Sequence, residues 1–294
     1  MRNYKILIIN IIAVVLIYFF CKYILIFCLI SAEKYDFKHL IRLTNEAVLL
    51  PVDYETFYKR HQFVPTVIPK ENNGKKPIVI FGCSFAEGLF LPNEEKFSYR
   101  LYESTGREIH NRAYCAQGLQ YMLYQLEDEK FYQEVPEPEY VVYVFIEDHI
   151  RRLYRECCPW IKSLFYKVDE NGKLKKIDNL LYHTFPMMCV RKLSPEVSDY
   201  DKAYKFLRQH FIYAKELADK HWKNTKWIIL VYEDIPLEYF EELKKYGYTI
   251  APAKDLVPSD FYTNLKYRLS ATDEHPSKDA WLTLTPKFAK KYIK

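Results

Sequence analysis

The chain has 294 residues, of which 49% are hydrophobic and 28% are charged. This composition is typical of a globular protein with one large domain or two ordinary ones, and it excludes collagen-like, low-complexity and wholly disordered chains. The formal net charge of +5 is spread along the sequence, without the clustered Lys and Arg residues or the motifs of a nucleic-acid binder. We therefore expect no nucleic-acid partner.

The N-terminus departs most from average composition. Its apolar run from Ile6 to Ile30, interrupted by a single Lys, is long enough as a helix to cross a bilayer core of about 30 Å. We interpret residues 1–31 as a single-pass membrane anchor. A cleaved secretory signal is the alternative, although the apolar run is longer than a typical signal requires. Arg2 and Lys5 favour a cytoplasmic N-terminus and an extracytoplasmic domain.

The rest of the chain divides into a stalk and a domain. Residues 32–76 are polar and mixed, and they predict a membrane-proximal stalk that contains a helix. Residues 77–294 predict an α/β domain with an irregular insertion around 151–198. Neither the cysteines nor the histidines show metal-ligand spacing, so we expect no metal and no cofactor.

Beyond Pro77, short apolar runs alternate with amphipathic stretches. The runs predict buried strands at 78–81, 108–113, 141–146, 227–232 and 248–251, and the stretches predict helices at 96–104, 119–130, 200–222 and 237–246. Strands that alternate with helices indicate a parallel sheet with helices on both faces. In such sheets, ligands bind beyond the C-terminal ends of the strands.

Two distant segments carry candidate chemistry. Ser84 directly follows the first predicted strand and is flanked by two of the few glycines, which exposes its hydroxyl at the edge of the sheet. A hydroxyl needs a base to become a nucleophile, and His275 can supply one, with Pro276 at the predicted start of a helix. Asp273 can orient this imidazole and stabilise its cation. The order and spacing of the two segments indicate a serine hydrolase.

At these positions the sequence resembles the SGNH/GDSL hydrolase superfamily, over about residues 77–292. Gly82-Cys83-Ser84 is similar to the first block of the family, with Cys where Asp is usual, and residues 273–276 resemble the last block of its envelope acyltransferase-like branch. The resemblance implies a three-layer α/β/α domain with a flavodoxin-like parallel sheet. It implies Ser84 as the nucleophile, His275 as the base and Asp273 as its orienting partner.

The same resemblance gives an oxyanion hole. Residues 111–118 are similar to the second block, which implies that the backbone N–H groups of Ala116 or Gly118 act together with that of Ser84. The third block usually supplies an Asn side chain, but here the chain reads Phe145-Ile-Glu-Asp-His149. An ionised carboxylate cannot donate a hydrogen bond, whereas His149 can. We hypothesise that His149 fills this role; a structural residue that holds the loop is the alternative.

Arg151 and Arg152 follow in the same loop. They either bind an anionic part of the substrate or form ion pairs at the surface.

Together these features predict a membrane-anchored serine esterase or O-acyltransferase. Its expected substrates are acyl esters, acetyl esters in particular, of envelope or exported polysaccharide, and its expected partners are the membrane, the acylated carbohydrate and polysaccharide-assembly proteins. One alternative is a catalytically silent SGNH-like module that binds a glycan or an assembly partner. The other is a structural, membrane-tethered protein, in which Ser84 and His275 would lie on different faces of the domain.

Overall fold

The computed structural model describes residue 18 and residues 66–68, 74–153, 166–170, 173–177 and 200–293. Apart from residue 18, these belong to one of two compact units of the chain, formed by Tyr58–Cys157, Ser163–Ile177 and Pro195–Lys294. The predicted membrane anchor, apart from residue 18, lies outside the described residues, as do most of the stalk and most of the insertion. Within the described ranges, no helix has the length and apolarity needed to cross a membrane.

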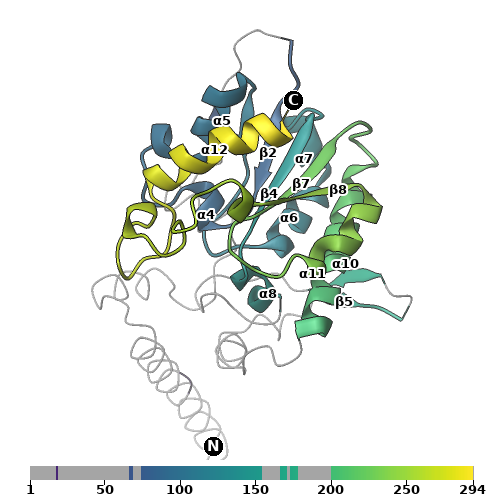
Figure 1. Ribbon diagram of the computed structural model, residues 1–294. Helices are drawn as coiled ribbons and strands as arrows, with labels where there is room; N and C mark the ends of the chain where they lie inside the picture. The colour runs from purple at the N-terminus through teal and green to yellow at the C-terminus, as the bar shows by residue number, and fades with distance from the viewer. Residues whose placement is uncertain are drawn as a thin grey trace, which may run out of the picture. The chain divides into compact units, whose positions relative to one another are not determined.

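A six-stranded sheet forms the centre of the described unit (Figure 1). In spatial order its strands are β1 (Thr66–Ile68), β3 (Ile109–Asn111), β2 (Ile78–Phe81), β4 (Tyr140–Phe145), β7 (Lys226–Val231) and β8 (Tyr248–Pro252). The last five strands run parallel in the flavodoxin-like order, and β1 pairs antiparallel with β3 at one edge. The predicted parallel sheet is confirmed. The sheet also starts earlier than expected, because β1 lies in the segment predicted as stalk.

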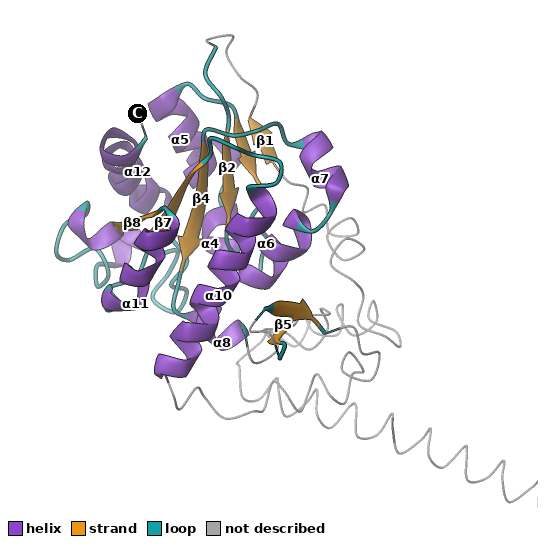
Figure 2. Ribbon diagram, turned by 90° about the vertical axis from the view of Figure 1, so that its right-hand side faces the viewer, coloured by secondary structure: helices purple, strands orange, loops and turns teal. Residues whose placement is uncertain are grey.

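Helices cover both faces of this sheet (Figure 2). On one face α5 (Phe97–Thr105) packs against α12 (Lys278–Tyr292). On the other, α10 (Tyr200–Ala218) packs against α6 (Leu119–Leu126) and α11 (Glu238–Glu241). The shorter elements are α4 (Ser84–Glu87), η1 (Asn93–Glu95), α7 (Glu129–Glu134), α8 (Asp148–Arg152), β5 (Tyr166–Val168), β6 (Leu174–Lys176), η3 (Glu242–Tyr246), η4 (Ala253–Asp255) and η5 (Leu265–Tyr267).

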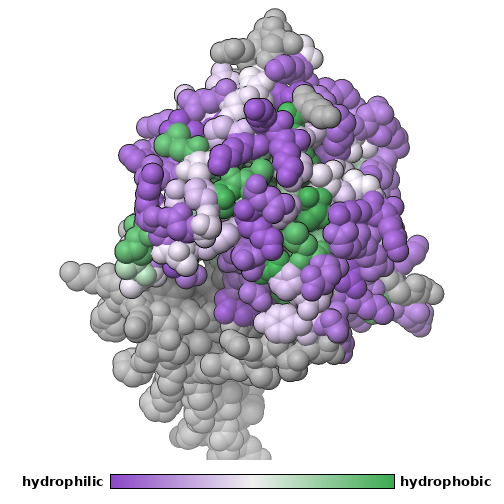
Figure 3. Space-filling view, viewed as in Figure 1, coloured by the Kyte–Doolittle hydropathy of each residue, from purple (hydrophilic) through white to green (hydrophobic). Residues whose placement is uncertain are grey.

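The core consists of two layers because successive strand residues point to opposite faces. On β4, Val144 joins the buried cluster beneath α5 and α12. Its neighbour Tyr143 packs instead against Phe211 of α10, with ring centroids 5.1 Å apart. Strands buried on both faces are apolar throughout, which is why the sequence shows continuous apolar runs. The outer face seen in Figure 3 is mostly hydrophilic, with apolar side chains in small separate areas.

Local capping changes two of the predicted helices. The stretch at 119–130 is divided, because the Asp128 carboxylate accepts a hydrogen bond from the Lys130 N–H and starts α7. The stretch at 237–246 is α11 followed by the 3₁₀-helix η3, and it ends at Gly247, whose φ is 82°.

Candidate active site

Ser84 is the first residue of α4, which follows β2 after a tight turn. A Cβ atom at the preceding Gly82 would lie 2.8 Å from Ala86 Cβ and 3.0 Å from the Val144 carbonyl oxygen, and Gly82 has a φ of 150°. Only glycine allows the turn to pack this closely against β4. Gly88 closes α4 with a φ of 77°, and its N–H donates to the Ser84 carbonyl at 3.0 Å. The turn therefore places Ser84 at the C-terminal edge of the sheet.

His275 reaches the same edge from the other end of the chain. It lies in the loop between η5 and α12, which is held by a β-bridge between Arg268 and Pro276. The helix begins only after Ser277, whose hydroxyl caps its first turn. His275 and Pro276 thus precede α12, whereas the sequence predicted that the helix starts with them. The bridge therefore holds the loop directly next to the imidazole.

Ser84, His275 and Asp273 form a hydrogen-bonded chain. The Nε2 atom of His275 lies 2.7 Å from Ser84 Oγ, and its Nδ1 atom lies 2.6 Å from Asp273 Oδ1. The His275 backbone N–H donates to the same carboxylate oxygen at 3.0 Å. A proton on Nδ1, bound to Asp273, leaves the Nε2 lone pair free to accept the Ser84 proton. The structure therefore brings the two predicted segments together in the geometry of proton transfer.

Two phenylalanine rings flank the imidazole. The ring centroid of Phe85 lies 4.9 Å from that of His275, and the centroid of Phe90 lies 6.4 Å away in an edge-on arrangement. Phe90 has a φ of 66° and is 73% exposed. The left-handed conformation costs a non-glycine residue about 1 kcal/mol, and an exposed ring gains little from burial. Phe90 therefore borders the catalytic imidazole, a contact that the sequence analysis did not predict.

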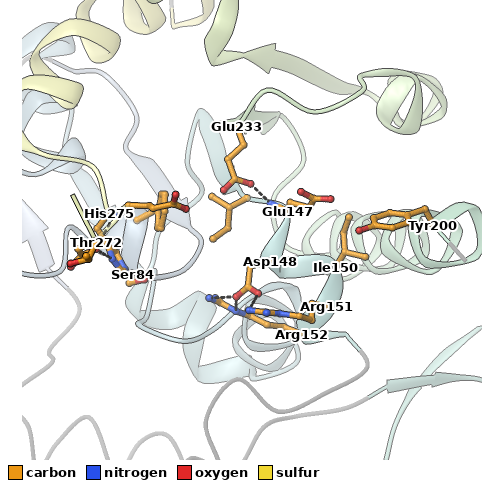
Figure 4. A pocket seen from close by; sticks show the side chains of 14 residues that line it. Ser84, Glu147, Asp148, Ile150, Arg151, Arg152, Tyr200, Glu233, Thr272 and His275 are labelled. Carbon is orange, nitrogen blue, oxygen red and sulfur yellow. Dashed lines mark hydrogen bonds and ion pairs between the residues drawn. The ribbon is translucent and has the colours of Figure 1, made fainter. Parts of the chain in front are cut away.

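A cavity of about 560 Å³ opens beside Ser84 and His275, a size typical of small-ligand sites (Figure 4). Its walls come from the segments that follow β2, β4 and β7, from the start of α10 and from the His275 loop. Its lining includes Ser84, Phe85, Glu147, Asp148, Glu233 and His275. The site therefore lies where the sequence analysis expected it, beyond the C-terminal ends of the strands.

The loop after β3 is tied to the turn that holds Ser84. The Asn111 side chain donates to the Ala86 carbonyl at 2.9 Å and accepts from the Ala113 N–H at 3.2 Å. Ala116, in the same loop, has a φ of 61°. Neither Ala116 nor Gly118, the two candidate oxyanion donors, lines the cavity. Asn111 thus ties the second block to the turn that holds the nucleophile.

His149 does not reach the cavity. Its side chain is fully buried, and Nδ1 lies 3.0 Å from the Tyr143 hydroxyl oxygen. Burial, reinforced by the nearby Arg152 cation, holds the pKa of His149 well below its usual value, so the ring is neutral. This placement is at odds with the hypothesis that His149 donates to an oxyanion. It fits the alternative, a structural residue that holds the loop after β4.

Arg151 and Arg152 both line the cavity, and both pair with Asp148. Arg152 Nε donates to the carboxylate at 2.6 Å, its guanidinium also donates to the Gln117 carbonyl, and its side chain is 11% exposed. Arg151 contacts the same carboxylate and is 44% exposed. Burial raises the pKa of Asp148, but the two guanidinium groups outweigh it and lower the pKa overall. The ion-pair alternative thus describes both arginines, and one carboxylate faces both cations.

Glu233 lines the cavity and was missed by the sequence analysis. Its carboxylate accepts a hydrogen bond from the Glu147 backbone N–H at 2.5 Å. Burial and the nearby carboxylates of Glu147, Asp148 and Glu274 raise the pKa of Glu233, against the effect of that hydrogen bond. The signal was present, since Glu233 comes directly after a predicted strand, where binding residues are expected in parallel sheets.

Two described cysteines lie close to the nucleophile in the sequence or in the loop after β3. Cys83, next to the nucleophile, is fully buried, and Cys115 is half-buried. Burial raises the pKa of Cys83 and keeps it neutral. Among the residues that the structure describes, no three His, Cys, Asp or Glu side chains are grouped to hold a metal ion.

The described domain has a flavodoxin-like parallel sheet, a Ser turn after its first parallel strand and a His in the loop before its last helix. These are the features that the resemblance to the SGNH/GDSL hydrolase superfamily implied.

The similarities of this chain to known proteins are structural. No protein-family model and no curated protein matches the sequence. Among solved structures, the chain is similar to a lipolytic protein of the G-D-S-L family from Veillonella parvula, at 13% identity over 74% of this chain and 98% of that one, with a TM-score of 0.47. It is similar to an acetyl xylan esterase from Butyrivibrio proteoclasticus, at 10% identity over 76% and 64%, with a TM-score of 0.45. A family two carbohydrate esterase from Cellvibrio japonicus matches at 11% identity over 76% and 63%, with a TM-score of 0.41.

Proposed function

We propose that this protein is a serine esterase of the SGNH type that cleaves acyl esters. The observation that carries the proposal is the chain of hydrogen bonds from Ser84 Oγ through His275 to Asp273, at the wall of a cavity. Ser84 Oγ attacks the ester carbonyl carbon while His275 Nε2 takes the hydroxyl proton. His275 then gives this proton to the leaving alcohol, and water, activated by the same imidazole, hydrolyses the acyl-serine. Asp273 stabilises the imidazolium in both steps.

The oxyanion is stabilised by backbone N–H groups in this proposal. The Ser84 N–H, at the start of α4, and an N–H of the loop after β3 at Ala116 or Gly118 are the proposed donors. Because the usual Asn of the third block is absent and His149 is buried elsewhere, one donor is missing. Loss of one such donor lowers kcat by about 10² to 10³. We therefore expect a slow esterase.

We also propose a location and a substrate class for this esterase. We propose a single-pass membrane protein whose domain lies outside the cytoplasm, because an apolar run of membrane-spanning length precedes the domain in the sequence. Acetyl esters of envelope or exported polysaccharide suit this location, and polysaccharide-assembly proteins are the proposed partners. The acyl group passes either to water or to a sugar hydroxyl.

A second candidate is a catalytically silent module that binds a glycan or an assembly partner. The absent Asn donor and the Cys83 that replaces the usual Asp favour it.

A fluorophosphonate probe, applied to the full chain, separates the two candidates. If the protein is an esterase, the probe should label the wild type but not the folded Ser84→Ala variant. It should also label the control Ser104→Ala, which changes an exposed serine near the end of α5. A folded wild-type protein that is not labelled would favour the silent module. Incubation with an acetyl-ester donor and an oligosaccharide acceptor then distinguishes hydrolysis from transfer, because only transfer yields an acetylated oligosaccharide.

A further inference from the structure

A second cavity adjoins the catalytic one. Its volume is about 170 Å³, which corresponds to about five or six water molecules. Phe85, Glu233 and Glu274 line both cavities, so the two share a wall. The second cavity is rich in aromatic side chains: Phe85, Tyr232, Phe261, Tyr262 and Tyr267.

The second cavity is lined by more carboxylates than cations. Its lining contains the carboxylates of Glu233, Asp234 and Glu274 and one cation, Arg268. Arg268 pairs with Glu274 at 3.1 Å, and Lys254 pairs with Asp234 at 2.8 Å. In the part of the chain that the structure describes, no Lys or Arg forms an ion pair with Glu233, and its carboxylate accepts a hydrogen bond from the Glu147 backbone N–H (Figure 4).

The catalytic cavity does not offset this negative charge. Its two cations, Arg151 and Arg152, are both engaged by Asp148, while Glu147 adds a further carboxylate to the lining. Burial and these neighbouring carboxylates raise the pKa of Glu233. A cation bound nearby would relieve this crowding, whereas an anion would increase it.

The second cavity lies beside the loop that carries His275. Glu274, which lines it, is the neighbour of His275 in the loop before α12, and Arg268 forms the bridge that holds this loop. His275 is the group that protonates the leaving alcohol in the proposed reaction. The alcohol part of a bound ester therefore points to the His275 loop and can extend into the second cavity.

On the basis of the proposed esterase function, we propose that the second cavity binds an ammonium group carried by the alcohol part of the ester. Aromatic faces attract cations through the ring quadrupole, and quaternary ammonium ligands are bound in cages of such rings. Glu233 supplies the uncompensated carboxylate on the shared wall. The substrate class is an ester of an amino alcohol or amino sugar whose amine is protonated or quaternary. Anionic substrates, which Arg151 and Arg152 suggested from the sequence, are disfavoured.

Two isosteric esters test this proposal. Choline acetate and 3,3-dimethylbutyl acetate share the acyl group and the shape of the alcohol, and they differ only in a positive nitrogen in place of a carbon. We expect kcat/KM for choline acetate to be about tenfold higher. Glu233→Gln should reduce this ratio to about two or less. Glu129→Gln, which removes a carboxylate on α7 that is 78% exposed, is the control and should retain the wild-type ratio.

A binding measurement separates this inference from the esterase proposal. Tetramethylammonium chloride is titrated into the full-chain Ser84→Ala variant by calorimetry, with sodium chloride at the same ionic strength as the reference. Saturable binding that is lost in Ser84→Ala/Glu233→Gln supports the cavity even if neither ester is hydrolysed. Absence of binding, an equal rate for the two esters, or a ratio unchanged by Glu233→Gln would overturn the inference.

Discussion

The Nε2 atom of His275 lies 2.7 Å from the Oγ atom of Ser84, although 191 positions separate the two residues. The fold creates this contact through helix packing. Trp281 of α12 packs against Phe97 of α5, with ring centroids 4.9 Å apart, and α5 follows shortly after the Ser84 turn. The loop before α12 therefore returns to the edge of the sheet where β2 ends. The geometry of the triad thus depends on the α5–α12 layer as well as on the two loops.

Asp273→Asn should lower kcat by about 10² to 10⁴ while the protein remains folded. An amide cannot stabilise the imidazolium, and its NH₂ group can favour the unproductive tautomer of His275. Initial rates with p-nitrophenyl acetate measure the effect. Asp255→Asn, an exposed carboxylate in η4, is the matched control and should keep the wild-type rate. A rate within twofold of wild type in Asp273→Asn would show that the carboxylate has no role in the reaction.

Gly82→Ala should both destabilise the domain and lower activity. The new Cβ would lie 2.8 Å from Ala86 Cβ at a φ of 150°, so the turn that holds Ser84 must move. We expect a loss of about 1 to 3 kcal/mol in the free energy of unfolding. Gly74→Ala is the control, because its φ of 72° is also unfavourable but nothing lies within 4 Å of the added Cβ. Urea unfolding should show a clearly smaller loss for Gly74→Ala; equal losses would mean that the close packing at Gly82 has no cost.

The strands could be predicted from the sequence because local patterns determine them. A strand buried on both faces needs an uninterrupted apolar run, and 78–81 is such a run, with observed bounds Ile78–Phe81. The pairing of Ser84 with His275 followed from their residue types and chain order. A nucleophilic hydroxyl needs a base, and the chain has only eight histidines that could supply one.

The remaining features depend on tertiary contacts that no local pattern contains. β1 is only three residues long and forms because β3 offers a free edge. His149 and Glu233 both follow predicted strands, yet one side chain turns into the core toward Tyr143 and the other faces the cavity. Sequence reasoning identifies the loop in such cases, but the direction of each side chain depends on what packs around it. Phe90 gave no signal, because its strained φ is a property of the folded loop.

Arg152→Ala should destabilise the domain more than Arg151→Ala. Arg152 is 11% exposed and binds both Asp148 and the Gln117 carbonyl, so its removal leaves a largely buried carboxylate with one cation fewer. We expect a loss on the order of 2 kcal/mol. Arg151 is 44% exposed, and its ion pair should contribute less than about 1 kcal/mol. Chemical unfolding of the two variants measures the difference, and a larger loss for Arg151→Ala would contradict the observed arrangement.

Glu87→Gln should make stability less dependent on pH. Burial raises the pKa of Glu87 from 4.5 to about 7, although a hydrogen bond from the Cys115 backbone and the nearby Lys96 oppose the shift. A carboxyl group whose folded pKa is raised favours the folded state while it is protonated. That contribution is complete below pH 4.5 and is lost as the pH rises toward 7, at a cost of up to about 3 kcal/mol.

Urea unfolding at pH 5 and pH 8 tests this sign. Gln is neutral at both pH values and can still accept the Cys115 hydrogen bond, so the Glu87→Gln variant should gain on the order of 2 kcal/mol over wild type at pH 8 and much less at pH 5. Glu94→Gln, an exposed carboxylate in η1, should leave the pH dependence of wild type unchanged. Equal free energies of unfolding for Glu87→Gln and wild type at both pH values would show that the Glu87 carboxyl does not titrate in this range. A carboxyl with a raised folded pKa makes the two free energies diverge at pH 8.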